Sequence, residues 1–265
     1  MGKPKILVSN DDGPTSRGLH ALVRALLDVG EVIPVVPEGP RSGTSMSLTF
    51  HKPLRIREVQ IAGEKGYVIS GSPADAVMMA LNKVLPEKPD AMASGINIGD
   101  NTGLQDVYAS GTVSAALQAA LSGIPAVAFS MQISESVIFS PTDAKADFGI
   151  AAFHARKVMH WLVQNKLPEG VNLLNVNVPA NAALNTKAVF TQLALHKYEN
   201  YIVERLDPRG KPYYWVWGNR LKKYDEGSDA KAIIEDSLVS VTPLHMNPTW
   251  STAGMEGLMK TLNGG

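Results

Sequence analysis

The sequence predicts an α/β fold: a Rossmann-like, mostly parallel sheet with helices on both faces, followed by a protruding C-terminal β-hairpin region. Three observations support this prediction. Short apolar runs alternate with amphipathic segments in strand–helix–strand order over the first 180 residues. Turn residues follow these runs, beginning with Asn10-Asp11-Asp12-Gly13. Tyrosine and tryptophan residues gather between residues 198 and 217, on both sides of a Pro-Arg-Gly turn.

The first expected elements form a βαβ unit. Residues 5–9 are a short apolar strand, leucine and valine recur at helical spacing between residues 19 and 27, and residues 31–36 form the next strand. Such a connection makes the strands parallel and covers the sheet with helices. The same patterns predict helices at 74–85, 112–121 and 145–165, and strands at 90–94, 126–131 and 173–178.

The chain is expected to divide near residue 180. Residues 1–180 are assigned to the Rossmann-like core, and residues 181–265 to a hairpin region that returns to the core. The hairpin turns at residues 208–210, where the sequence reads Pro-Arg-Gly. Aromatic hairpins that project from a core often serve contact between subunits, although a simple local β-sheet is an equal alternative.

Composition excludes several classes of protein. Lys plus Arg is 25 and Asp plus Glu is 25, which gives a formal net charge of zero. A protein that binds a nucleic-acid polymer normally has a basic excess or stripe, so no such partner is expected. The chain has no cysteine, which excludes disulfides, thiolate metal sites and cysteine nucleophiles. A metal ion would therefore need oxygen or imidazole ligands.

No membrane or secretory segment is expected. Only a three-residue apolar run precedes the first acidic residues, which is too short for a secretory signal. Residues 107–134 carry no charge, but serines, a glutamine and a Gly-Ile-Pro break interrupt them. They are interpreted as a buried helix, a turn and a buried strand rather than a membrane span. The protein is expected to be soluble and cytoplasmic.

Polar segments follow the expected strands and should converge at one edge of the sheet, where ligands bind in open α/β folds. Asp11 and Asp12 come after the first strand, at a turn that would let both carboxylates reach one ion. Carboxylate oxygens, completed by a hydroxyl and an amide oxygen, suit Mg²⁺ or Mn²⁺. The alternative is that one of these aspartates caps the following helix.

Three further segments belong to this edge. Ser42 stands in a turn after the second strand, where a lone serine is more often structural. Asn97 lies between two glycines, and could bind a ligand or occupy a left-handed turn. Ser110-Gly111-Thr112 opens an apolar helix, whose backbone N–H groups could hold a phosphate. The alternative for this segment is a plain helix cap by Ser110.

Several segments together resemble one known family, the SurE (survival protein E) nucleotidases and phosphatases. They occur in the family's order and cover nearly the whole chain. They are residues 6–13, 41–43, 71–75, 94–101, 110–113, 174–179 and 240–244. Each motif is weak alone, but seven in register are highly specific.

The resemblance implies a metal-dependent phosphomonoesterase that acts on nucleoside 5'-monophosphates or other small phosphomonoesters. It implies that one divalent ion, Mg²⁺ or Mn²⁺, is bound by four residues, and that residues 1–180 form the catalytic core. The implied metal ligands are Asp11, Asp12, Ser42 and Asn97, and the implied substrate-binding residues are Asn97, Ser110, Gly111 and Thr112. The family also implies a C-terminal region exchanged between subunits, in a homodimer or homotetramer.

The expected mechanism is direct attack by water, because the chain has neither a cysteine nor a Ser–His–Asp pattern. Asp11, Asp12 and Asn97 are the candidate catalytic residues, and one of the two aspartates could act as the general base. Alternatives are a non-catalytic binder of phosphorylated ligands, an aspartyl-phosphate phosphotransferase, and a broad acid phosphatase or exopolyphosphatase. The adjacent acidic pair disfavours a simple anion binder, and the D-x-D-x-T spacing of aspartyl phosphatases is absent.

Overall fold

The computed structural model describes residues 2–133, 146–249 and 251–263. Within them, one sheet of nine strands has the order β3-β4-β2-β1-β5-β6-β7-β11-β8, and a separate pair joins β9 to β10. The strands of the main sheet are β1 (Lys5–Ser9), β2 (Glu31–Pro37), β3 (Ile56–Ile61), β4 (Glu64–Ile69), β5 (Ala91–Ile98), β6 (Ala126–Met131), β7 (Leu173–Val178), β8 (Ala188–Phe190) and β11 (Val239–Leu244). The predicted α/β fold is confirmed.

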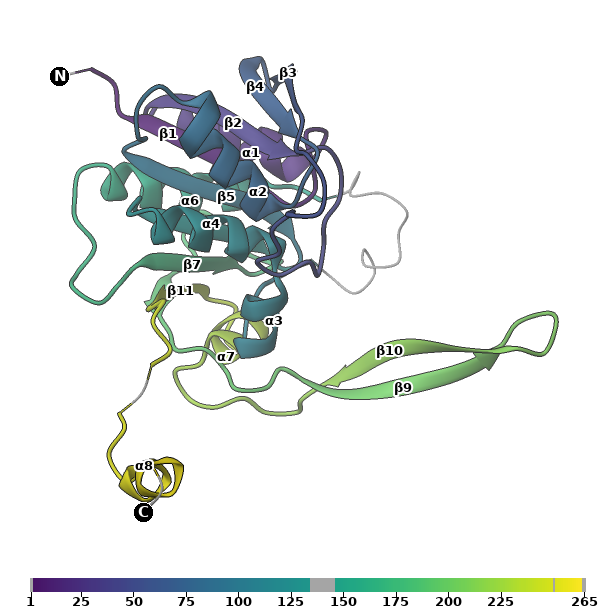
Figure 1. Ribbon diagram of the computed structural model, residues 1–265. Helices are drawn as coiled ribbons and strands as arrows, with labels where there is room; N and C mark the ends of the chain where they lie inside the picture. Colours follow the sequence, from purple (N-terminus) through teal and green to yellow (C-terminus); the bar gives the residue numbers. More distant parts are fainter. Residues whose placement is uncertain (1, 134–145, 250, 264–265) are drawn as a thin grey trace.

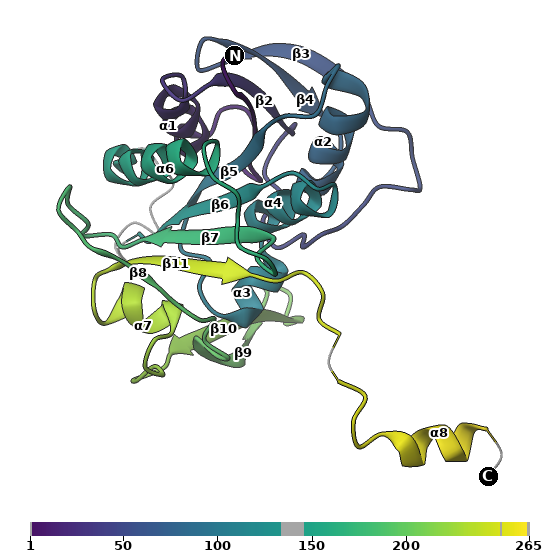
Figure 2. The same ribbon diagram turned by 90° about the vertical axis from the view of Figure 1, so that its left-hand side faces the viewer.

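Six neighbouring strands, from β4 to β7, run parallel, whereas β3 and β11 are antiparallel to their neighbours β4 and β7. Helices cover both faces of this sheet (Figure 2). The helices are α1 (Arg17–Leu26), α2 (Pro73–Met79), α3 (Leu104–Ala109), α4 (Gly111–Leu121), α6 (Gly149–Leu162), α7 (Asp229–Ile234) and α8 (Glu256–Leu262). In the described chain, no helix is long and apolar enough to cross a membrane.

Alternation along β1 explains why the sheet has two apolar layers. Ile6 and Val8 point into a core cluster with α1 and α6, whereas Leu7 points into a second cluster with α2 and α4. All three side chains are fully buried. A strand buried on both faces must be apolar throughout, which is the pattern that the sequence shows. Both faces of the sheet are thus packed against apolar side chains, and the polar loops lie at its carboxyl edge.

Some boundaries differ from those expected from the sequence. The strand expected to end at residue 94 continues as β5 to Ile98, so Asn97 lies on a strand and not in a loop. The helix expected over 74–85 is α2 followed by a π-helical turn, Ala80–Val84, because Leu85 N–H donates to Ala80 O. Leu85 is extended there, as the residue before a proline prefers.

The helix expected to start at Lys145 begins four residues later. It is α6, and Gly149 N–H donates to Asp147 Oδ1 at its start. Lys145 itself lies outside the described residues. Sequence reasoning also missed several short elements: the antiparallel pair β3–β4, strands β8 and β11, and helices α3, α7 and α8.

The expected hairpin is present and projects far from the body of the molecule (Figure 1). It consists of β9 (Tyr198–Leu206) and β10 (Pro212–Arg220), which pair in antiparallel register from Tyr198 to Arg220. Gly210 N–H donates to Asp207 O in the turn. The chain then returns to the main sheet through α7 and β11, which is the expected return to the core.

Candidate active site

The first and fourth predicted polar segments meet through direct contact. Asp11 follows β1 and is only 3 % exposed, and Thr112 in the first turn of α4 donates its hydroxyl to Asp11 Oδ1 at 2.5 Å. Gly111 lies so close that an added Cβ would stand 2.6 Å from the Asp11 Cβ. The start of α4 therefore packs directly on the acidic turn, and only glycine fits at position 111.

The second polar segment is bound to the same turn. Arg41 N–H donates to Asp11 O at 2.7 Å, and the Arg41 carbonyl would lie 3.2 Å from a Cβ at position 111. Ser45 donates its hydroxyl to Tyr108 O, which ties the segment to the end of α3. Ser42 follows Arg41 directly and is exposed. The segment that carries Ser42 thus borders Asp11, as expected.

The acidic pair is not used to cap the following helix. Ser16 is the N-cap of α1, and its hydroxyl accepts a hydrogen bond from Leu19 N–H. The turn itself is closed by the Asn10 side chain, which bonds both the N–H and the carbonyl of Gly13. Ser16 therefore takes the capping role that the sequence left open for Asp11 or Asp12.

Asn97 reaches the same edge from the neighbouring strand. Ser9 of β1 pairs with Ser94 of β5, and Asn97 stands three residues further along β5, opposite Ser130 of β6. Its Nδ2 donates to Gly99 O at 2.8 Å. The left-handed-turn alternative is therefore wrong for Asn97. With its nitrogen engaged, the side-chain oxygen is the atom that suits a cation.

Ser110 is the N-cap of α4, since its hydroxyl accepts a hydrogen bond from Val113 N–H at 3.1 Å. The capping alternative is confirmed for this residue. The Ser110 hydroxyl accepts this bond and can still donate its own hydrogen, whereas the Thr112 hydroxyl donates to Asp11. A phosphate at this helix start could therefore meet the Ser110 hydroxyl and the backbone N–H groups, at the positive end of an eleven-residue helix.

The residues at this edge fit a divalent metal ion. Two carboxylates, a hydroxyl and an amide oxygen form a hard donor set of the kind that Mg²⁺ and Mn²⁺ prefer. Burial raises the pKa of Asp11 above its ordinary value, and the hydrogen bond from Thr112 offsets only part of this effect. A cation beside Asp11 would stabilise the charged carboxylate. Across the described residues, no three His, Asp or Glu side chains form an alternative metal cluster.

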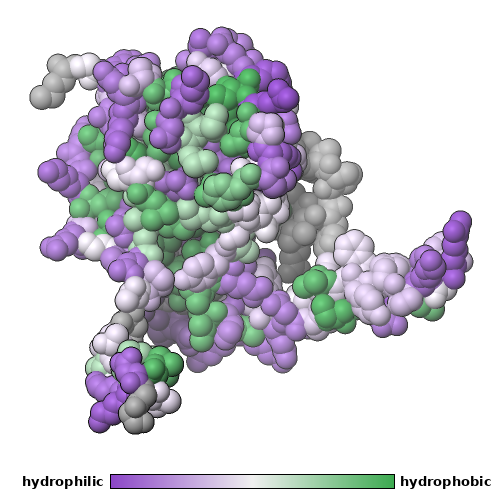
Figure 3. Space-filling view, in the orientation of Figure 1, coloured by the Kyte–Doolittle hydropathy of each residue, from purple (hydrophilic) through white to green (hydrophobic). Residues whose placement is uncertain are grey.

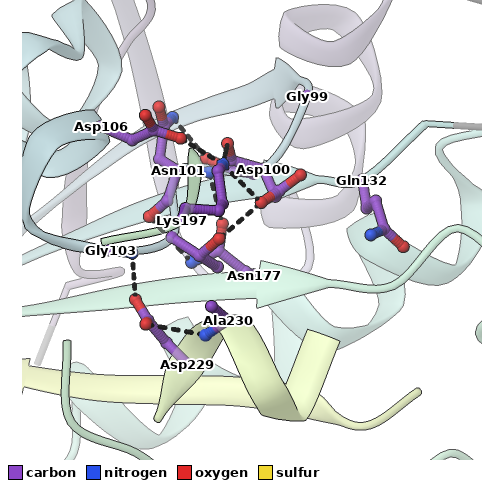
Figure 4. A network of polar contacts seen from close by, with 12 residues as sticks. Gly99, Asp100, Asn101, Gly103, Asp106, Gln132, Asn177, Lys197, Asp229 and Ala230 are labelled. Atoms are coloured by element: carbon purple, nitrogen blue, oxygen red, sulfur yellow. Dashed lines mark hydrogen bonds and ion pairs between the residues drawn. The ribbon is translucent and has the colours of Figure 1, made fainter. Parts of the chain in front are cut away.

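A polar network holds the loop that follows β5, and sequence reasoning gave it no role (Figure 4). Asn101 N–H donates to Asn177 Oδ1, and the Asn101 carbonyl accepts hydrogen bonds from Asn175 and Asn177 on β7. Asn101 Nδ2 donates to Ser130 Oγ on β6. The repeated asparagines of the 174–179 motif are the sequence signal for this network, because polar residues on a fully buried strand need partners.

Lys197 lies in the same network and is almost completely buried. Its ammonium group forms ion pairs with Asp100, at 2.9 Å, and with Asp106. Burial alone would lower the pKa of Lys197, but the two carboxylates outweigh burial and raise it. Burial alone would raise the pKa of Asp100, but Lys197 reverses the shift and lowers it. For Asp106 burial outweighs Lys197, and the pKa is raised.

A cavity of about 720 Å³ lies away from this edge, between α6 and the outer strands β8 and β11. Its lining is mainly apolar and includes Trp161, Phe190 and Leu184, with no carboxylate. A phosphoryl group bound with a metal ion requires charged and polar partners. The lining includes Lys157 and Lys187 but offers no carboxylate for a divalent ion.

Comparison with known proteins assigns the chain to a family. The family model described as "Survival protein SurE" matches residues 6–200. The chain belongs to the SurE family. This assignment confirms the family resemblance inferred from the seven sequence motifs, and the matched region contains every residue of the candidate site.

Relatives align over nearly the whole chain. The 5'-nucleotidase SurE of Methanothrix thermoacetophila is 40 % identical over 248 residues, which cover 92 % of this chain and 94 % of the relative. That of Archaeoglobus fulgidus is 42 % identical over 247 residues, 93 % of each chain. The crystal structure of the SurE protein from Aquifex aeolicus superposes with a TM-score of 0.82 at 33 % identity, covering 98 % of this chain and all of that one. The chain therefore shares the overall fold of that SurE structure over nearly its whole length.

Proposed function

We propose that this protein hydrolyses nucleoside 5'-monophosphates to nucleoside and phosphate, with one divalent metal ion, Mg²⁺ or Mn²⁺. It is a phosphoric monoester hydrolase of the SurE family, whose relatives are named 5'-nucleotidases. The observation that supports this activity best is the packing of Gly111 and Thr112 on Asp11. Through this packing, the helix start proposed to bind phosphate contacts the acidic turn proposed to bind the cation.

The proposed metal ligands are Asp11, Asp12, Ser42 and Asn97. Asp11, Asn97 and the Ser42 segment lie at the carboxyl edge of β1, β2 and β5. A bound divalent ion would neutralise charge on the phosphoryl group and make a water acidic enough to react near neutral pH. Asp11, Asp12 and Asn97 are the proposed catalytic residues, and one of the two aspartates accepts the proton of the attacking water.

The phosphate is proposed to bind at Ser110, Gly111 and Thr112, with Asn97 beside it. Gly111 has no side chain, so the backbone of the first turn of α4 can approach the phosphate closely. Ser110 fixes the start of this helix as its cap, and Thr112 fixes Asp11 through its hydroxyl. These side chains orient the two halves of the site, while backbone N–H groups stabilise the charged oxygens.

We also propose a homodimer or homotetramer, with residues 1–180 as the catalytic core and residues 181–265 as the region that makes subunit contacts. Large apolar side chains on the hairpin are strongly exposed, including Trp215 at 59 % and Val216 at 75 %. Helix α8 also stands apart from the body and exposes apolar residues, shown in green in Figure 3. Exposed apolar surface of this extent is typical of interfaces. The cytoplasmic location stays a prediction of the sequence.

The activity is tested by measuring phosphate release from a panel of nucleoside 5'-monophosphates, p-nitrophenyl phosphate and short polyphosphate. We expect turnover with Mg²⁺ or Mn²⁺ and none in excess chelator. Full activity after complete removal of metal would overturn the metal-dependent reaction. Equal rates across the panel would identify a broad phosphatase, and preferred cleavage of polyphosphate would identify an exopolyphosphatase instead.

A further inference from the structure

Residues 98–109 connect the two halves of the proposed site. Asn97, at the start of this segment, is a proposed metal ligand, and Ser110, at its end, begins the proposed phosphate site. Asp100 lies three residues after Asn97, and Asp106 lies four residues before Ser110. Ser110 N–H donates to Asp106 O at 2.8 Å. The position of Asn97 is therefore coupled to that of Asp100, and the position of Ser110 is coupled to that of Asp106.

One ammonium group joins both ends of this segment. Lys197 Nζ lies 2.9 Å from Asp100 Oδ2 and 3.4 Å from Asp100 O, and it also pairs with Asp106. The lysine side chain is 4 % exposed and that of Asp100 is 7 % exposed. Figure 4 shows the lysine between the two carboxylates. Buried ion pairs are costly to form and break only at a large penalty, so this bridge holds the segment in one arrangement.

The middle of the segment is held by different contacts. Gly103 N–H donates to Asp229 Oδ2 at 2.8 Å, and Leu104 N–H donates to Ala194 O. Asn101 is held by β6 and β7, as described above. These contacts do not involve the ammonium group of Lys197. The lysine is therefore not needed to close the loop, and its particular contribution is at the two ends.

We propose that Lys197 is a positioning residue for the hydrolytic reaction: by bridging Asp100 and Asp106, it sets the spacing between Asn97 and the phosphate-binding start of α4. This inference rests on the proposed metal and phosphate site. Lys197 belongs to the C-terminal region, directly before β9. The C-terminal region thus contributes to catalysis within its own chain, through a residue that touches neither metal nor substrate.

The ion pairs of Lys197 should affect the coupling between metal binding and phosphate binding more than the affinity for either ligand alone. A displacement of about 1 Å can cost a factor of about 10² in rate when two groups must act on one substrate. In Lys197→Met, binding of Mn²⁺ alone should change less than threefold. The ratio of phosphate dissociation constants without and with Mn²⁺ should fall at least fivefold, and kcat should fall at least tenfold.

Calorimetric titration of Mn²⁺ alone, inorganic phosphate alone and phosphate in saturating Mn²⁺ gives this ratio, and thermal melts give stability. Lys197→Arg keeps a cation between the carboxylates and should retain the ratio within threefold. The matched control is Lys231→Met, since Lys231 also contacts several carboxylates in the C-terminal region but none in residues 98–109. It should leave the ratio and kcat unchanged.

Lys197→Met removes the cation that pairs with the buried carboxylate of Asp100 and the partly buried carboxylate of Asp106, so this variant could fold poorly. The variant that combines it with Asp100→Asn and Asp106→Asn removes this charge problem. We expect this triple variant to recover thermal stability but neither the ratio nor kcat. If the triple variant recovers thermal stability, the ratio and kcat together, or if the ratio is unchanged in Lys197→Met, then Lys197 has a purely structural role. Either result would overturn the positioning role of Lys197 but not the proposed active site. If the wild-type protein itself binds phosphate equally with and without Mn²⁺, the proposed site fails, and this inference with it.

Discussion

The carboxyl edge of the sheet buries polar side chains, whereas the β9–β10 hairpin exposes apolar ones. At the edge, polar residues are buried: Asp11 is 3 % exposed and Thr112 is fully buried. On the hairpin, apolar residues are exposed: Trp215 is 59 % and Val216 is 75 % exposed. Both arrangements are unfavourable in an isolated chain, because buried charge needs a partner and exposed apolar surface needs cover.

The difference indicates which kind of binding partner would suit each region. The contacts at the edge are already made within one chain, through Gly111, Thr112 and Arg41, and the partner that we propose there is a small cation or anion. The hairpin exposes large apolar side chains, so the partner that we propose for it is another protein surface. Changes at the edge should therefore affect chemistry, whereas changes on the hairpin should affect assembly.

The largest effect is expected at Asp11. In Asp11→Asn, the side-chain oxygen can still accept the hydrogen bond from Thr112, so the fold should persist. The loss of a carboxylate ligand should lower kcat about 10³-fold, since a metal ion contributes several kcal/mol of transition-state stabilisation. Steady-state kinetics and circular dichroism on one preparation test both points. Asp12→Asn should behave similarly, and near wild-type rates in both variants would refute the metal assignment.

A smaller loss is expected at Gly111. An added methyl group would stand 2.6 Å from the Asp11 Cβ, so Gly111→Ala must push α4 and the acidic turn apart. We expect kcat/KM to fall about 10²-fold and the affinity for Mn²⁺ to weaken, with a lower Tm. Gly39→Ala is the matched control, because a methyl group there meets nothing within 4 Å. Equal kinetics in the two variants would remove this helix start from the site.

The hairpin tests the other side of the comparison. Replacing Trp215 and Trp217 by serine should shift the protein to a smaller species in light scattering at micromolar concentration. Stability of the chain should change little, because exposed positions usually contribute within about 0.5 kcal/mol. Lys211→Ser, near the turn, is the control and should leave the molar mass unchanged. A wild-type monomer, or an unchanged assembly in the double variant, would contradict the proposed subunit contact.

The sequence predicted the sheet edge better than the details of the site. Strand–turn–helix order is local, so β1, Asn10 to Gly13 and α1 could be read from periodicity and turn residues. Parallel strands then require the polar loops to converge, and Asp11 does meet Gly111 and Thr112. The Ser110 cap was an alternative that the sequence offered, whereas the hydrogen bond from Thr112 to Asp11 joins distant residues and depends on packing.

Lys197 could not be found from the sequence. Lysine is almost never fully buried, so an isolated lysine before an exposed hairpin is expected to face water. Its partner Asp100 is 97 residues away, and nothing periodic links the two. The pair β3–β4 was missed for a related reason: its strands are mixed in polarity, with one buried residue in β3 and three in β4. Edge elements of this kind are specified by neighbours rather than by their own pattern.

The smallest effect concerns stability at low pH. It tests whether the ion pair between Asp100 and Lys197 stabilises the folded protein. The pKa of Asp100 is lowered, because Lys197 outweighs the effect of burial. A carboxyl group whose folded pKa is depressed contributes stability above its unfolded pKa, about 3.9, and loses it as pH falls through the lower folded value. Wild type should therefore exceed Asp100→Asn in unfolding free energy by about 2 kcal/mol at pH 7.

This difference should shrink as pH falls below about 4, because Asp100 is then protonated first in the unfolded chain and, at lower pH, also in the folded protein, where it resembles asparagine. Chemical unfolding of both proteins between pH 7 and pH 3 measures it. Glu58→Gln is the control: its ion pair with Lys65 has both side chains more than half exposed, so its removal should show little effect at any pH. A difference between wild type and Asp100→Asn that stays constant with pH would mean that Asp100 stabilises the fold by packing. The ion pair would then not be what holds the end of the loop after β5.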